Sequence, residues 1–114
     1  MDQRIRTHAA IIVDHSTRIE SGDDVVVSMP AVAEDLAVAL HETLGDRGAN
    51  PVYLNNSERA GRAYLRASDE EAFETPEHEL ALYEAADAAI IARGGPNVSE
   101  QSDVTPETNA AYRR

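Results

Sequence analysis

Three short apolar runs, separated by segments with helical periodicity, constrain the fold of this chain more than any other feature. The runs are DVVVSM at 24–29, PVYL at 51–54 and AAII at 88–91. Val25, Val26 and Val27 are consecutive and β-branched, which is typical of a strand covered on both faces. Strands of this kind that alternate with helices favour a parallel sheet with helical crossovers.

The segments around these runs predict the helices. Apolar residues recur with helical spacing over 3–19 and over 30–45, and the second segment is opened by Pro30 and closed by glycines. A short helix is expected over 55–68, and Thr75-Pro76-Glu77 begins another, with Leu80 and Tyr83 facing inward. We therefore expect one α/β domain over residues 1–114. Its sheet is predicted to be small, three-stranded and mostly parallel, with helices on both faces, like half of a doubly wound, Rossmann-like fold.

The last residues repeat a helix-start signature. Thr105-Pro106-Glu107 combines an N-cap residue, a proline suited to the first helical position and an acid favoured by the helix dipole. This pattern predicts a helix that begins there and would run on past residue 114. We expect residues 108–114 to be frayed or held by a neighbouring chain.

Composition narrows the class of protein. A chain of 114 residues can bury a core without disulfides, and the absence of cysteine excludes thiolate metal sites and cysteine nucleophiles. No apolar run approaches the length of a membrane span. We expect a soluble, cytoplasmic protein.

The charge balance indicates which partners the chain can bind and the salt concentration in which it works. The chain has 21 acidic and 10 basic residues, a net charge of −11, and all its basic residues are arginine. Such a surface repels phosphate backbones and anionic lipids, so neither nucleic acid nor a membrane is expected as a partner. High acidity without lysine is typical of proteins from salt-in halophiles. In molar salt the Debye length falls to about 3 Å, so the repulsion between carboxylates is screened while their charge still favours solubility. An acidic mesophilic protein is the alternative.

Polar residues follow the predicted strands. In open α/β sheets ligands bind at the carboxyl ends of the strands, which here carry Ser28, Asn55, Asn56, Arg93 and Asn97. Polar residues at such positions also serve as helix caps and turn formers. The sequence leaves this alternative open for Ser28, Asn55 and Asn56. We treat Ser28, Asn55, Arg93 and Asn97 as candidates for lining a cleft.

The sequence contains no recognisable catalytic, metal-binding or phosphate-binding motif. RGGPN at 93–97 lacks the spacing of a dinucleotide-binding or phosphate-binding loop, and the chain has no lysine for a P-loop. The histidines at 8, 15, 41 and 78 lack the spacing of a zinc helix. The G-x-S-x-G elbow is also absent. We expect no catalytic residue, metal ligand or cofactor within these 114 residues.

Three blocks of sequence nevertheless carry a family resemblance. They are IIVDHSTRIESGDDVVVSMPAVAEDLAVALHETLGDRGANPVYL, RAYLRASDEEAFETPEHELALYEAADAAIIARG and NVSEQSDVTPETNAAYRR. In their order and spacing they resemble the N-terminal domain of the thermophilic metalloprotease family of aminopeptidases, in its haloarchaeal branch. None of the blocks is a catalytic motif.

The resemblance implies a cytoplasmic, homodimeric exopeptidase that removes N-terminal residues from peptides with two divalent metals, zinc or cobalt. Members of that family are several times longer, and their metal ligands lie in a C-terminal region. The resemblance therefore implies a piece truncated before its catalytic domain and inactive alone. The resemblance further implies that this domain forms a wall of the interdomain cleft, lined by Ser28, Asn55, Arg93 and Asn97. Its partners would be the missing catalytic domain and a peptide substrate.

Two other interpretations remain open from sequence. One is an autonomous acidic α/β module that binds another protein or a second copy of itself through an exposed face. The other is a small nucleotide-binding protein, which the glycine loop and the negative charge disfavour.

Overall fold

The computed structural model describes residues 2–68, 76–93 and 109–113. Helix α1 runs on into a π-helical turn over Ile12–Ser16, and a 3₁₀ turn over Ala31–Ala33 leads into α2. The helices and strands, in chain order, are α1 (Gln3–Ile11), β1 (Asp24–Met29), α2 (Glu34–Arg47), β2 (Asn50–Asn55), α3 (Glu58–Ala67), α4 (Glu77–Ala85), β3 (Ala88–Ala92) and β4 (Asn109–Arg113).

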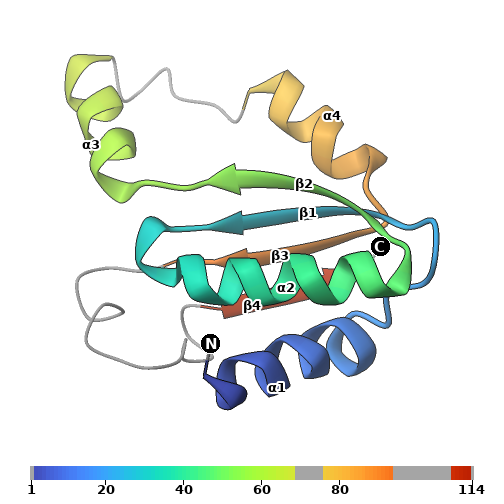
Figure 1. The fold of residues 1–114 in the computed structure, drawn as a ribbon. Coiled ribbons are helices and arrows are strands. Elements are labelled where there is room, and N and C mark those ends of the chain that lie inside the picture. The colour runs from blue at the N-terminus through green and yellow to red at the C-terminus, as the bar shows by residue number, and fades with distance from the viewer. Residues whose placement is uncertain (1, 69–75, 94–108, 114) are drawn as a thin grey trace.

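The sheet has the strand order β2-β1-β3-β4 (Figure 1). Strand β1 is parallel to both of its neighbours, with Val26 opposite Val52 of β2 and Ala89 of β3. Strand β4 is antiparallel to β3, with Ala111 opposite Ile90. The parallel part of the sheet thus has β1 at its centre.

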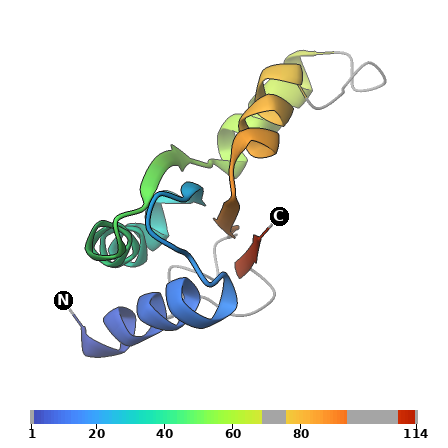
Figure 2. The same ribbon diagram turned by 90° about the vertical axis from the view of Figure 1, so that its right-hand side faces the viewer.

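Helices lie on both sides of the sheet: α1 and α2 on one side, and α3 and α4 on the other (Figure 2). The larger core lies under α1 and α2, where Val25, Val27 and Ile90 are almost completely buried. Val26 and Ala89 belong to a smaller cluster with side chains from α4. Burial of one such aliphatic side chain contributes about 1.5–3 kcal/mol, so the run of valines stabilises both layers.

The predicted α/β class, the three parallel strands and the helices on both faces are confirmed. Helix α2 begins after Pro30, through the 3₁₀ turn, and ends at Gly48, whose φ of 77° provides a left-handed C-cap. Ser57 caps α3 by accepting a hydrogen bond from the Ala60 backbone N–H. Tyr83 packs inward, as predicted.

The helix predicted to run through the last residues is wrong for 109–113, which form β4. Thr105, Pro106 and Glu107 lie outside the described residues. The free edge of β3 offers a row of unpaired backbone groups, and pairing with that edge outweighs the helical preference of an alanine-containing segment. The parallel sheet therefore gains an antiparallel fourth strand.

Two smaller predictions also fail. The first helical segment ends at Ser16 rather than 19, because the Thr17 hydroxyl donates to the Ile12 carbonyl over 2.8 Å and Arg18 takes a positive φ of 51°. Leu80, expected to face inward, is 47% exposed. In the turn before β1, Asp23 is buried, and its carboxylate accepts a hydrogen bond from the Glu20 N–H.

Candidate functional site

The strand order reverses direction between two neighbouring strands of the sheet. From β1 the chain crosses to β2 on one side and then returns to β3 on the other side. Connections therefore diverge between the carboxyl ends of β1 and β3, which is the switch point where open α/β sheets bind ligands. Both strands end there in polar or exposed residues, Ser28 near the end of β1 and Arg93 after β3.

Asn56 joins the three parallel strands at this edge. Its side-chain Nδ2 donates to Ser28 Oγ over 3.0 Å and to the Ala92 carbonyl over 2.8 Å. Its backbone N–H donates to the Met29 carbonyl over 2.9 Å. One residue after β2 thus holds the ends of β1 and β3 in fixed positions.

The structure describes three of the four predicted cleft residues, and they differ in exposure. Ser28 is only 6% exposed, and its hydroxyl accepts from Asn56, so its contact is structural. Asn55 and Arg93 are exposed at the ends of β2 and β3. Asn97 lies outside the described residues. Among the described candidates, Asn55 and Arg93 are therefore the ones open to a ligand.

The sequence does not identify Asn56 as the residue that bridges the strands. By sequence, Asn55 and Asn56 are equally candidates for a helix cap, yet the side-chain cap of α3 is Ser57. A polar residue directly after a strand carries no signal that distinguishes a cap from a bridge between strands, since the bridge depends on strand order.

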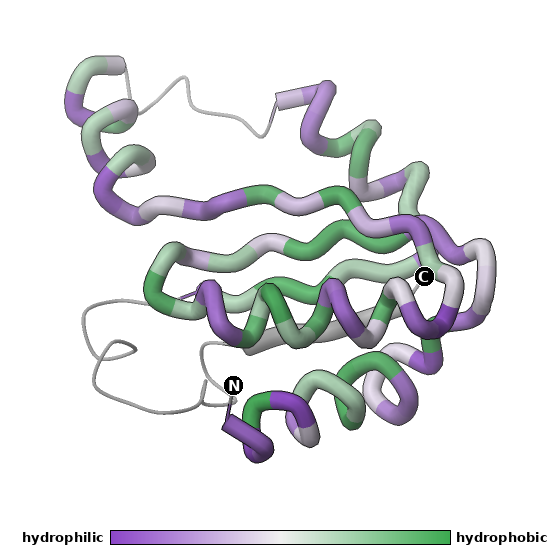
Figure 3. Tube along the Cα trace, in the orientation of Figure 1, coloured by the Kyte–Doolittle hydropathy of each residue, from purple (hydrophilic) through white to green (hydrophobic). Residues whose placement is uncertain are grey.

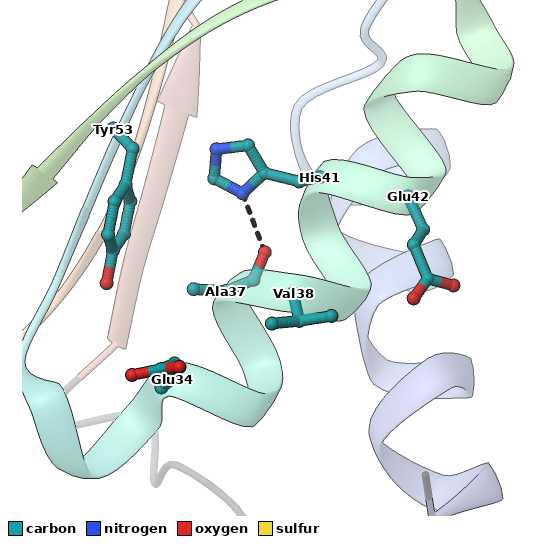
Figure 4. Close-up of a pocket in the computed structure, with 6 residues that line it drawn as sticks. All are labelled: Glu34, Ala37, Val38, His41, Glu42 and Tyr53. Atoms are coloured by element: carbon teal, nitrogen blue, oxygen red, sulfur yellow. Dashed lines mark hydrogen bonds between the residues drawn. The ribbon is translucent and has the colours of Figure 1, made fainter.

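A second feature is a pocket of about 500 Å³ between α2 and β2 (Figure 4). His41 points from α2 toward Tyr53 of β2, and the two rings meet edge to face with centroids 5.3 Å apart. The lining residues are Glu34, Ala37, Val38, His41, Glu42 and Tyr53. The sequence analysis assigned no role to this group, because His41 and Tyr53 come from different elements.

Contacts in the pocket identify the proton donor on His41 and shift the pKa of Tyr53. His41 Nδ1 lies 2.7 Å from the Ala37 carbonyl oxygen, so Nδ1 carries a proton and donates it to that oxygen. Burial raises the pKa of the Tyr53 hydroxyl, and the nearby negative charge of Glu34 raises that pKa further. The pocket therefore holds a neutral phenol beside carboxylates.

Neither feature fits a divalent metal. Within residues 2–68, 76–93 and 109–113, no three histidine or acidic side chains are grouped closely enough to hold an ion. A two-metal site needs several such ligands at once. The described part of the chain therefore provides no ligand set for such a site. None of the helices in this described part is long and apolar enough to cross a membrane.

Comparison with known proteins gives one result that bears on function. The family model described as thermophilic metalloprotease (M29) matches residues 1–114. A search of curated proteins finds no match to the chain.

Proposed function

Because the chain belongs to the thermophilic metalloprotease family, we propose that it acts as the N-terminal domain of a two-metal aminopeptidase that hydrolyses N-terminal residues from peptides. In this role it forms a wall of the cleft between two domains. Catalysis belongs to a separate metal-binding region, and residues 1–114 alone are inactive.

The carboxyl edge of the sheet is the observation that carries this proposal. Asn56 ties Ser28 to the Ala92 carbonyl and so makes the edge a rigid surface. Asn55 and Arg93 are exposed on either side of this tie. A guanidinium and a carboxamide can bind the carboxylate and the backbone groups of a peptide, which suits a wall that orients substrate.

The metals, zinc or cobalt in this proposal, are held elsewhere, because the described residues provide no ligand set. When bound, such a pair supplies a nucleophilic hydroxide and polarises the peptide carbonyl. The residues of this domain contribute binding and orientation alone.

The proposed setting is the cytoplasm of a halophile. Support comes from the net charge of −11 and from the use of arginine as the only basic residue type besides histidine. Carboxylate-rich surfaces stay soluble in molar salt because salt screens their mutual repulsion.

Substitution of Arg93 tests the proposed wall. In the polypeptide that joins this domain to its metal-binding region, Arg93→Ala should raise KM for peptides about tenfold and leave kcat nearly unchanged, since a lost ground-state contact acts on binding. Arg6→Ala is the matched control, because Arg6 is also exposed but lies on α1 rather than at a strand end. Unchanged kinetics in Arg93→Ala would remove this residue from the wall.

A further inference from the structure

Strand β2 is the outermost strand on one side of the sheet, so one of its edges faces no other strand in the described part of the chain. The backbone N–H groups of Asn50 and Asn56 donate hydrogen bonds on the β1 side. Backbone groups alternate in direction along a strand, so those of Pro51, Tyr53 and Asn55 point outward. This free edge therefore presents the N–H groups of Tyr53 and Asn55, together with their carbonyl groups.

Side chains leave this edge accessible. Val52 is 46% exposed and Tyr53 is 41% exposed, and Pro51 and Asn55 are exposed as well. Figure 3 shows hydrophilic and apolar positions alternating along β2. An exposed strand edge is a template for a further strand. Pro51 has no N–H to donate, which restricts such pairing to the second half of β2.

The pocket between α2 and β2 lies beside this edge, because Tyr53 belongs to both. Tyr53 is paired with Val27 of β1, which is buried in the core under α1 and α2, so the Tyr53 side chain lies on the α2 face of the sheet (Figure 4). Glu34, Val38 and Glu42 recur at every fourth position of α2 and line the pocket as one stripe. A strand added to β2 would thus place alternate side chains next to this stripe.

The pocket is suited to a positive charge. Its lining residues include no arginine, and Glu34 and Glu42 form no ion pair among the described residues. His41 adds a further acceptor, because its Nδ1 donates to the Ala37 carbonyl and leaves Nε2 with a lone pair. The Tyr53 ring can also contact a cation through its face. These groups together favour a basic side chain as the occupant.

The spacing of the two glutamates fits an extended chain. Glu34 and Glu42 are eight residues apart, which is about 12 Å along a helix, and α2 runs beside the strands (Figure 1). Residues i and i+4 of a strand lie on one face about 13 Å apart. Val38 lies between the glutamates and is 41% exposed. Two basic side chains four positions apart, with an apolar one midway, would therefore meet this stripe.

We propose that the free edge of β2 and this pocket bind an extended, basic segment of another protein, which adds a strand to the sheet. Backbone hydrogen bonds to Tyr53 and Asn55 hold the segment, and the pocket selects side chains in the order basic-x-apolar-x-basic. Charge favours such a partner further, because the whole chain carries a net charge of −11. The inference does not depend on the peptidase assignment, since this docking uses neither a free N-terminus nor a metal.

Titration with a synthetic peptide tests the proposal. The probe is acetyl-Thr-Lys-Thr-Val-Thr-Lys-Thr-amide, whose blocked ends prevent it from binding as an aminopeptidase substrate. In NMR spectra of residues 1–114, the backbone amide signals of Tyr53 and Asn55 should shift as the peptide binds. Replacement of both lysines by glutamine should raise the peptide Kd about tenfold. No binding, or shifts confined to residues outside α2 and β2, would overturn the proposal.

Methylation of backbone nitrogens in the probe separates strand pairing from attraction between charges. Alternate N–H groups of an added strand point toward β2, and the others point to solvent. N-methylation of one alternate set should therefore abolish binding, whereas N-methylation of the other set should change the Kd by less than about twofold. The same loss from both sets, or no loss from either, would contradict an added strand.

Substitutions in the pocket provide the matched comparison. Glu34→Gln and Glu42→Gln should each raise the Kd about three- to tenfold. Asp35→Asn is the control, because Asp35 is an exposed acid in the same turn of α2 as Glu34 but does not line the pocket. It removes the same charge and should leave the Kd within about twofold of the parent value. Circular dichroism verifies that each variant is folded, and equal effects from Glu34→Gln and Asp35→Asn would overturn the role of the pocket.

Discussion

Asn56 donates a hydrogen bond from its side-chain Nδ2 to Ser28 Oγ over 3.0 Å, across 28 positions of sequence. A second hydrogen bond from the same nitrogen reaches the Ala92 carbonyl over 2.8 Å. The carboxyl edges of three strands are therefore tied through one carboxamide. This relationship leads to the first prediction.

Asn56→Ala should lower the free energy of unfolding by about 1–3 kcal/mol, because it leaves a buried hydroxyl and a strand-end carbonyl without their donor. Urea denaturation measures the change. The neighbouring Asn55→Ala removes the same group from an exposed position and should change stability by less than about 0.5 kcal/mol. Equal effects from the two substitutions would contradict the bridging role.

Gly48→Ala should destabilise the domain by about 1–2 kcal/mol, since φ at Gly48 is 77° and a Cβ there would lie 2.8 Å from Ser21 Oγ. Gly61→Ala is the control. Gly61 lies within α3, and an added Cβ would meet nothing within 4 Å, so the change should stabilise by about 0.5–1 kcal/mol. Thermal unfolding of the two variants should therefore shift in opposite directions, and shifts of the same sign would refute the assignment.

The sequence predicts the centre of this fold better than its edges. Val25, Val26 and Val27 form a run that only a doubly covered strand explains, and β1 is such a strand. Strand β4 is not predictable locally, because it exists through pairing with β3 and its residues alone favour a helix. The same limit applies to the site, where Ser28 and Arg93 are found from strand ends but the bridge by Asn56 follows from strand order.

The ion pair between Asp14 and Arg47 should make stability depend on pH. Arg47 donates to both carboxylate oxygens, at 2.9 and 2.7 Å, and these hydrogen bonds hold the pKa of Asp14 below its ordinary value of 3.8. A lowered folded-state pKa contributes stability that is complete above the ordinary pKa and is lost as pH falls through the folded-state value. Asp14→Asn should therefore be less stable than the parent at neutral pH and equal to it in strong acid.

Because this pair is exposed, its effect at neutral pH should be small and should shrink in molar KCl. Denaturation curves of Asp14→Asn and the parent at several pH values provide the measurement. A stability difference that grows as pH falls below 3.8 would contradict the role of the ion pair.

Salt should stabilise the whole domain. With a net charge of −11, carboxylate repulsion opposes the compact state at low ionic strength, and molar KCl screens it. The midpoint of thermal unfolding should rise by about 4–8 °C for each kcal/mol regained. Equal melting temperatures in about 0.1 M and about 1 M KCl would refute adaptation to high salt.

The assignment of catalysis to a separate metal-binding region can be measured directly. Residues 1–114, supplied with zinc or cobalt, should not hydrolyse an aminoacyl chromogenic substrate. A polypeptide that contains both this domain and the proposed metal-binding region should hydrolyse the substrate and lose that activity on chelation. Chelator-sensitive turnover by residues 1–114 alone, or no turnover by the longer polypeptide with either metal, would contradict the account.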